Sequence, residues 1–594
     1  MIVDISLFLG LVLTSVMFIY VAPAIAFFPR WASDSDFIFA VPILSIGIVY
    51  GIARLFLLLG VWSPEIVQIT LAGIFLVALG RSRSWIVEFR NTERKVDWRI
   101  IAVVGVLLLP VLAELAAAPF DSDDENTSWN YWAKLAFLGN APDLFYTRAP
   151  YPQLFTFILA TNYALLGDWS YQLVIKAALW MIPLSCFGLL ATFVIKRFGR
   201  SAALIVLLIV VYFVDLRGEF RVAYADPLMS TFLLAGFYFL YREGPKTSNW
   251  QDLCLASVFF SLCGLTKQAG LPWAMLFFPI LYAISQERRL RHPRYWWPMI
   301  TPILVGGIWL LTEGNGVLAN RGVIQASLGD RDLIQQLTLA IKTYGKRPEL
   351  VITYLTFFIA ACWKPSWRKC VVAVSLAIST GLWLIFGGYQ YRLGIHNFLI
   401  AWFFIILFVS EDTLIRSGGS KSRTLDRVFI VSVCMLLIAS LIYSGLTINK
   451  RLRGTGSISL LDGLGRQAWS FLGYEGEAWI TELQASGDTR VLVFSNYLNG
   501  MLSPEFKVLR MEGLHSTDNP ETLAEYIENE GVTHFITIGN PLYRWGAGNL
   551  GLLTLASSCP QKYVTVSEAK GNQIGLFIDF QATLYRVSAF SCEK

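Results

Sequence analysis

The sequence predicts a mainly α-helical membrane protein that crosses the bilayer many times and carries a C-terminal α/β domain. Of its 594 residues, 55% are hydrophobic and 14% are aromatic, which is more apolar surface than a water-soluble chain of this length can bury. Apolar runs near the length needed to cross ~30 Å of hydrocarbon recur from Leu7 to Tyr443. We therefore divide the chain into a transmembrane domain at 1–450 and a soluble domain at 451–594.

About fourteen apolar runs have the length and composition of membrane spans. The first lacks a basic leader and is too long for the apolar core of a signal peptide, so we expect it to be retained. A shorter apolar segment at 152–167 is expected to lie along the membrane and not to cross it. The expected spans are 5–28, 38–60, 65–80, 101–118, 170–195, 202–216, 227–241, 252–266, 271–286, 297–312, 350–363, 370–387, 396–410 and 428–446.

Basic residues gather in alternate loops. The loops at 81–99, 196–200, 242–246, 287–294, 364–369 and 416–427 carry about twenty Lys and Arg, roughly twice as many as the other set. Because the loops richer in Lys and Arg face the cytoplasm, we expect a multi-pass protein of the plasma (inner) membrane whose C-terminal domain is extracytoplasmic or periplasmic. The net charge of +6 then reflects topology, and no nucleic-acid partner is expected.

The C-terminal part has the pattern of a small α/β domain. Strands are expected at 489–495 and 532–539, with a helix at 520–531 between them and later strands at 562–568, 573–579 and 583–588. Cys559 and Cys592 are the only cysteines of this part. In an oxidising compartment they are expected to form a disulfide, and two unpaired buried cysteines are the alternative.

An acidic stretch opens the loop at 119–151. Asp121, Asp123, Asp124 and Glu125 fall within five positions, directly after an apolar run. Carboxylates this dense at the membrane are costly unless water, a cation or a substrate meets them. Aromatic residues follow, and their rings suit both sugar stacking and the membrane interface. The alternative is an acidic interfacial loop with an aromatic belt.

Four further charged residues are expected on the same side as the acidic stretch. Asp226 precedes a span, where it could simply cap a helix, and Arg221 could pair with it or hold a phosphate. Lys267 lies in a polar break between two apolar runs and could merely snorkel, whereas Arg392 suits bidentate phosphate binding. The four histidines are scattered and no HExxH or CxxC motif occurs, so no His/Cys metal site is expected.

These motifs together resemble the GT-C superfamily of integral-membrane glycosyltransferases. The resemblance is to the branch with protein O-mannosyltransferases, the aminoarabinose transferase of lipid A and related bacterial enzymes that use polyprenyl-phosphate sugars, and it covers about residues 100–410. The signature WWDYG of oligosaccharyltransferases is absent, which disfavours transfer of a whole oligosaccharide to asparagine. The matching residues are Asp124, Trp129, Lys134 and Tyr151-Pro152 in the loop, Tyr224-Ala225-Asp226-Pro227 before a span, and Leu265-Thr266-Lys267-Gln268-Ala269-Gly270 at the polar break.

The resemblance implies a function. A sugar would move from a polyprenyl-phosphate donor in the bilayer to an acceptor hydroxyl on a glycan, lipid or protein, with inversion. Asp124 would be the general base, and Asp226 would orient the acceptor or share that role. Lys267 and Arg392, with Arg221 as a weaker candidate, would stabilise the leaving phosphate. Trp129, Lys134 and Tyr151 would belong to the substrate loop.

No cofactor is required for this chemistry, because cations that bind phosphate are already present. A divalent cation could still bind the carboxylates at Asp121, Asp123 and Asp124. Two other classes of function stay open: a flippase or transporter for lipid-linked sugars, and a non-catalytic membrane assembly protein with an outer binding domain. A transporter would more often show internal repeats and helices interrupted at mid-membrane, and we find no convincing repeat.

The fourteen-span topology predicts opposite locations for two loops. A reporter fused at Arg90 should lie in the cytoplasm, because its loop is among the richest in Lys and Arg, and one fused at Gly487 should lie outside. Paired phosphatase and fluorescent-protein fusions at each position measure this. Signals from the same side would contradict an even number of spans.

Overall fold

The computed structural model describes most of the helical domain and the sheet of the C-terminal domain. The described residues are 2–28, 38–91, 98–116, 120, 125–138, 152–168, 171–242, 249–312, 334–335, 338, 341–342, 347–386, 391–412, 435, 437–446, 479, 482–483, 485, 487, 489–493, 507–510, 519–539, 547–574 and 577–590.

The first half of the helical domain runs from the N-terminus to the loop before α13. Its elements are α1 (Ile2–Ser15), η1 (Val16–Val21), α2 (Ala22–Phe27), α4 (Val41–Leu58), α5 (Pro64–Asn91), α6 (Trp98–Ala116), η2 (Glu125–Asn130), α7 (Tyr131–Phe137), α8 (Leu154–Leu166), α9 (Gln172–Ala178), α10 (Met181–Phe198), α11 (Arg200–Leu208), η4 (Ile209–Phe213) and α12 (Leu216–Phe220).

The second half continues through α22. Its elements are α13 (Ala225–Tyr241), α14 (Trp250–Thr266), η5 (Gln268–Gly270), η6 (Trp273–Phe277), α15 (Phe278–Ser285), η7 (Arg289–Arg291), η8 (Pro293–Tyr295), α16 (Trp296–Thr312), α20 (Pro348–Cys362), α21 (Trp367–Phe386), η9 (Tyr391–Gly394) and α22 (Ile395–Asp412).

Nine helices of the described chain are long and apolar enough to cross a membrane, so the chain is a multi-pass membrane protein by helix length and hydropathy. Each coincides with an expected span. They are Ser6–Phe27, Val41–Leu58, Pro64–Ser82, Arg99–Ala116, Gln172–Phe198, Gln268–Ser285, Pro293–Thr312, Trp367–Ile385 and Tyr391–Asp412.

The other five expected spans are helices too short to count as candidates, so the described residues support nine candidate spans and not fourteen. Helices do lie at these places, but each has at most 17 residues, or ~25 Å at 1.5 Å per residue. Except at 428–446, these helices come from apolar runs that are already shorter than the ~20 residues needed to cross a bilayer core. They are Arg200–Tyr212, α13, α14, α20 and Leu437–Leu446.

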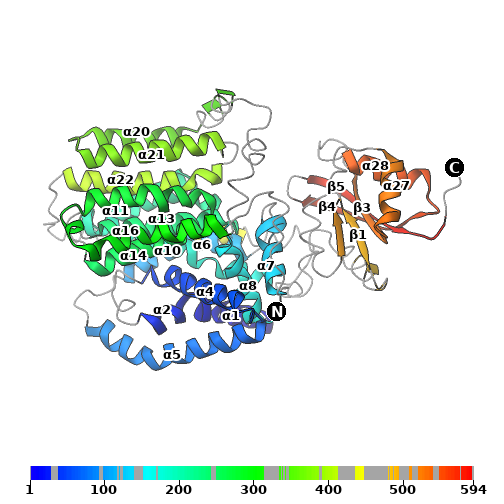
Figure 1. Ribbon diagram of the computed structural model, residues 1–594, viewed down its shortest axis with the longest axis horizontal. Coiled ribbons are helices and arrows are strands. Elements are labelled where there is room, and N and C mark those ends of the chain that lie inside the picture. Colours follow the sequence, from blue (N-terminus) through cyan, green and yellow to red (C-terminus); the bar gives the residue numbers. More distant parts are fainter. Residues whose placement is uncertain are drawn as a thin grey trace.

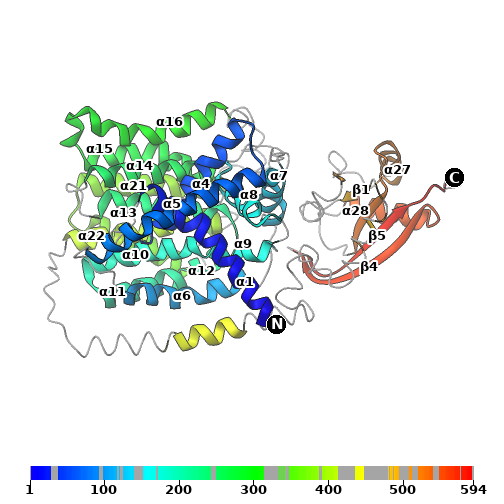
Figure 2. The same cartoon turned by 90° about the horizontal axis from the view of Figure 1, so that it is seen from below.

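Helix α13 is the centre of the helical domain. Every one of its residues from Ala225 to Tyr241 is buried, as expected for a helix that is apolar on all faces. It packs against α10, α14 and α22. Figure 1 shows α20, α21 and α22 on one side of this central layer and α1, α2, α4 and α5 on the other. Figure 2 shows α16 and α6 at its opposite edges.

The segment expected to lie along the membrane forms α8. All residues from Leu154 to Ala164 are buried, because α8 packs against α4, α5 and α7. Its 13 residues measure ~20 Å, less than the thickness of a bilayer core. The short helix is therefore present, and its orientation relative to a membrane stays a prediction.

The C-terminal domain contains one mixed sheet of five strands in the order β2-β1-β3-β5-β4. The strand β1 pairs in parallel with β2 and β3, whereas β5 is antiparallel to both β3 and β4. The sheet and helices form a body separate from the helical domain (Figure 1). The elements are β1 (Arg490–Val493), β2 (Lys507–Arg510), α27 (Pro520–Asn529), β3 (His534–Gly539), α28 (Ala547–Ser558), β4 (Tyr563–Ile574) and β5 (Phe577–Val587).

The expected strands at 490 and 534 and the helix between them are confirmed. Two details differ: the three later strands are two long ones, β4 and β5, and the sequence pattern missed β2 and α28. Cys559 is disulfide-bonded, and Cys592 lies outside the described residues. Five other cysteines of the described chain are free thiols.

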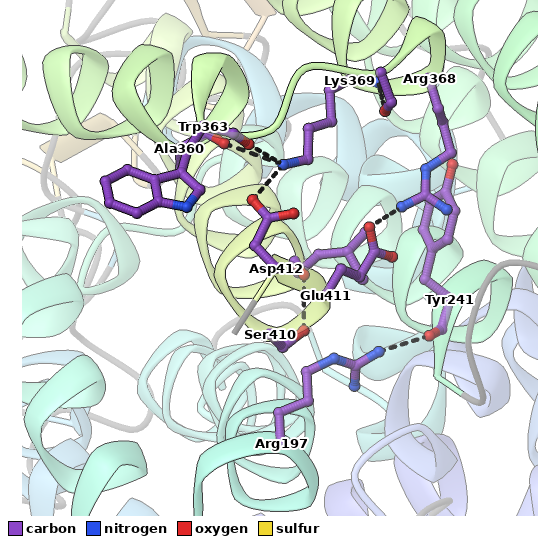
Figure 3. A network of polar contacts seen from close by, with 11 residues as sticks. Arg197, Tyr241, Ala360, Trp363, Arg368, Lys369, Ser410, Glu411 and Asp412 are labelled. Atoms are coloured by element: carbon purple, nitrogen blue, oxygen red, sulfur yellow. Dashed lines mark hydrogen bonds and ion pairs between the residues drawn. The ribbon is translucent and has the colours of Figure 1, made fainter. Parts of the chain in front are cut away.

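Charged residues hold together one end of the helical domain (Figure 3). The ammonium of Lys369 on α21 donates to Asp412 Oδ2 at 2.6 Å and to the carbonyl of Trp363 at 2.7 Å. The neighbouring Arg368 pairs with Glu411. Because Asp412 and Glu411 end α22 and Trp363 follows α20, these contacts fasten the three helices to each other.

We expect Lys369→Met to destabilise the helical domain by about 3–5 kcal/mol, because it leaves the carboxylate of Asp412 without its buried partner. The side chains of Lys369 and Asp412 are only 3% and 11% exposed. The thermal midpoint in detergent measures the effect. The control is Lys369→Met combined with Asp412→Asn, which removes the stranded charge and should recover most of the loss. A double variant less stable than the single one would contradict this account.

Candidate functional site

A second group of charged residues lies at the other end of the helical domain, where α13 and α22 begin. Asp226 is in the first turn of α13, and His396 is the second residue of α22. The ion pairs of Figure 3 lie at the C-terminal end of α22, which carries Glu411 and Asp412, and beside Tyr241, the last residue of α13. Since α13 has 17 residues, the two groups are ~25 Å apart along it.

The strongest contact of the site joins Asp226 to Lys267. The Lys267 ammonium donates to Asp226 Oδ1 at 2.7 Å and to Oδ2 at 2.6 Å. The two side chains are 1% and 11% exposed. A buried charge is tolerated only when a partner compensates the lost hydration, so neither residue can be removed alone without leaving an uncompensated charge.

The local backbone places Lys267 at this position. Helix α14 ends at Thr266, and Lys267 itself is extended, with φ −156° and ψ 150°. The turn η5 then folds back so closely that a Cβ on Gly270 would lie 2.2 Å from the carbonyl oxygen of Cys263. Only glycine fits there. The Leu-Thr-Lys-x-x-Gly pattern is therefore a helix break that directs a lysine towards the start of α13.

His396 lies next to this pair. It is 3% exposed, and its Nδ1 has no hydrogen-bond partner. The charges of Asp226 and Lys267 both act on its ring. An unpartnered buried nitrogen is costly, and it makes His396 a candidate to bind a polar group of a substrate. In the sequence, His396 is one of four scattered histidines and was assigned no role.

The last residue of the acidic stretch is held inside the domain. Glu125 is fully buried and accepts from Lys176 at 3.1 Å and from the backbone N–H of Ala223. Lys176, which the sequence placed inside a span without a role, neutralises this carboxylate. Asp121, Asp123 and Asp124 lie outside the described residues.

Two members of the expected substrate loop are packed inside the protein. Trp129 is 3% exposed, with its ring edge-on to Trp132 at 5.3 Å and to Phe155 at 5.8 Å. Lys134 is fully buried in α7. The ring of Trp129 therefore offers no flat face to solvent here. Tyr151 lies outside the described residues.

The two arginines differ in position. Arg392 lies with its guanidinium 4.0 Å from the ring centroid of Tyr224, two residues before Asp226, so it borders the site. Arg221 is half-exposed and pairs with Glu114 at 3.1 Å. The alternative in which Arg221 pairs with Asp226 is therefore wrong, because Lys267 already occupies both oxygens of that carboxylate.

Glu219 on α12 completes the group, and the sequence analysis missed it. The pKa of its carboxyl is raised to about 7, mainly by burial and also by the negative charges of Asp226 and Asp215, against the lowering effect of Arg392 and Arg221. Its only signal in the sequence was its place in the segment RGEFRVAYAD, where four charged residues lie between two apolar runs.

The comparisons with known proteins leave the family open. Neither the models of protein families nor the curated proteins gave a match to this chain. Among the described residues, no group of three or more His, Cys, Asp and Glu side chains could hold a metal ion. What the site can do follows from its own arrangement: paired and unpaired carboxylates, an ammonium, a guanidinium and an imidazole at one end of a membrane domain.

We expect Gly270→Ala to disrupt the site, because the new methyl group would collide with backbone and no rotamer change could relieve it. The variant should unfold at a lower temperature. Gly381→Ala is the matched control, since a Cβ there meets nothing within 4 Å and α21 is helical, so its midpoint should stay or rise. The thermal midpoint of each purified variant decides. A Gly270→Ala variant with the same thermal midpoint as the wild type would contradict the close approach of Gly270 to the carbonyl of Cys263.

Proposed function

We propose that this chain is a membrane glycosyltransferase that moves a sugar from a polyprenyl-phosphate donor to an acceptor hydroxyl. The observation that supports this most is the buried Asp226–Lys267 pair, with Arg392, His396 and Glu219 around it, at one end of the helical domain. Ionisable residues inside a membrane domain are expensive and usually mark function. The distribution of Lys and Arg among the loops predicts that this end faces the extracytoplasmic side.

The cations suit the donor. As the sugar leaves, negative charge develops on the phosphate oxygens, and fixed positive charge that meets it lowers the barrier. Lys267 provides a compact point charge, and Arg392 provides a planar guanidinium that binds phosphate in a bidentate manner. Both lie at the end of membrane helices, where the phosphate of a lipid would be found while its hydrocarbon chain stays in the bilayer.

The carboxylates suit the acceptor. The attacking hydroxyl must lose its proton as its oxygen bonds to the anomeric carbon, and a carboxylate within hydrogen-bond reach can accept it. Asp226 lies in the first turn of α13. Asp124 directly precedes Glu125, whose carboxylate binds the N–H of Ala223, three residues before Asp226. Attack opposite the phosphate in one displacement inverts the configuration.

We expect Lys267→Ala to weaken the use of the donor, compared per amount of folded protein because the variant also leaves the buried charge of Asp226 without its partner. The donor KM should rise with little change in kcat if the contact is equal in the bound and transition states, and kcat should fall as well if the contact strengthens as the phosphate leaves. The assay uses full-length protein in liposomes with a panel of polyprenyl-phosphate hexoses and pentoses and cell-envelope acceptors. It measures the polyprenyl phosphate that is released.

The turnover numbers of Asp124→Asn and of Asp226→Asn show whether either of these two carboxylates acts as the general base. Loss of a general base lowers turnover by about 10²–10⁴ with donor binding nearly unchanged. Wild type that releases no polyprenyl phosphate from any donor would overturn the proposed function. A flippase would instead move the intact donor across the bilayer, which the same liposomes report.

A further inference from the structure

Glu219 differs from three other carboxylates at this end of the helical domain, and unlike the exposed Asp215 it is partly buried. Asp226 binds Lys267, Glu125 binds Lys176 and the N–H of Ala223, and Glu114 accepts from Arg221 and from Tyr443 at 3.1 Å. No residue that the structure describes forms a hydrogen bond or an ion pair with Glu219. Of these four carboxylates, only Glu219 has both oxygens available.

Glu219 nevertheless lies inside the site. Its side chain is partly buried on α12, and the charges of Asp226 and Arg392 act on it. Tyr391 of η9 also lies within electrostatic range. A carboxylate that is partly shielded from water, within the electrostatic range of Asp226 and without a partner has the surroundings of a group that exchanges a proton.

We infer that Glu219 is the carboxylate that takes the proton from the acceptor hydroxyl. This inference rests on the proposed function. Both oxygens of Asp226 already accept from the ammonium of Lys267, at 2.7 and 2.6 Å, so an acceptor hydroxyl would have to displace Lys267 to reach them. Asp226 then serves to hold Lys267 in place, and Glu219 provides the basic oxygen.

The step balances without a further reagent. The acceptor oxygen forms a bond to the anomeric carbon, and the bond from that carbon to the phosphate oxygen breaks with its electron pair moving to the phosphate. The proton of the acceptor passes to Glu219, which afterwards releases it to water. Polyprenyl phosphate and the glycosylated acceptor are the products.

The role of Glu219 as the base makes the reaction rate depend on pH. Burial raises the pKa of Glu219 to about 7, so the carboxyl is protonated and inactive as a base below that pH and ionised above it. The rate should therefore rise as pH increases through about 7 and then level off. The groups that face Glu219 are Asp226 on α13, Arg392 and Tyr391 on η9, and Asp215 and Arg221, which flank α12.

The first test is Glu219→Gln, which preserves the size of the side chain and breaks no bond to a described residue. We expect kcat to fall about 10²–10⁴-fold with donor KM unchanged, measured as polyprenyl phosphate released in liposomes from pH 5 to 9. The residual rate should lose its rise near pH 7. A Glu219→Gln enzyme with the rate and pH profile of wild type would overturn the inference.

Asp215→Asn is the second test, because a purely structural role of Glu219 would not respond to it. Asp215 is exposed and has φ +54°, a conformation that asparagine adopts readily. The substitution removes a negative charge that raises the pKa of Glu219. The rise in rate should therefore move to lower pH and reach the same plateau. A rise that stays in place or moves to higher pH would count against Glu219 as the base.

Infrared difference spectra of the solubilised protein distinguish failure of this inference from failure of the proposed function. Wild type should show a protonated-carboxyl band that disappears as pH rises through about 7, and Glu219→Gln should lack it. A wild type with this band but without transfer to any acceptor would overturn the glycosyltransferase proposal and with it the role of Glu219 as base. An active wild type without this band would overturn the role of Glu219 alone.

Discussion

The arrangement of the helical domain depends on one buried ion pair, between Asp226 and Lys267. Asp226 begins the fully buried helix α13, and Lys267 follows α14, which packs along α13. Neither charge is stable in this environment alone, because burial removes the water that would hydrate it. The pair therefore fixes the starting point of α13 relative to the end of α14. The positions of His396, Glu219 and Arg392 follow from it, since their segments pack around the same end.

The two ends of the helical domain use charge differently. At the end shown in Figure 3, the described charges of Lys369, Asp412, Arg368 and Glu411 pair with each other and join α20, α21 and α22. At the other end, Asp226 and Lys267 are paired, but the oxygens of Glu219 and Nδ1 of His396 are not. Each of the four charges at the end shown in Figure 3 has an opposite charge as its partner, as a structural clamp requires. Incomplete pairing in a buried place is what a binding site requires, because a substrate can supply the missing partners.

The sequence predicted much of this, and its errors have physical causes. Described helices lie at all fourteen places, but five are too short to count as spans, because four of these apolar runs are themselves shorter than the ~20 residues that a span needs. The positive-inside pattern grouped Asp226, Lys267 and Arg392 on one side, and the structure places these three at one end of the helical domain. Which residues pair could not be predicted: Glu125 with Lys176 and Arg221 with Glu114 are contacts between distant segments. Glu219 was missed because its distinctive property, the lack of a partner, exists only in three dimensions.

The central claim is that the end of the domain with Asp226 and Lys267 receives the phosphate of a lipid-linked sugar. Photocrosslinking tests it most directly, with a polyprenyl-phosphate sugar that carries a diazirine on the first isoprene unit and full-length protein in liposomes. The account predicts crosslinks in the segments at 219–226, 265–270 and 391–396, and weaker labelling when unlabelled donor competes. Crosslinks confined to the helix ends around Lys369 and Asp412, or to the C-terminal domain, would contradict it.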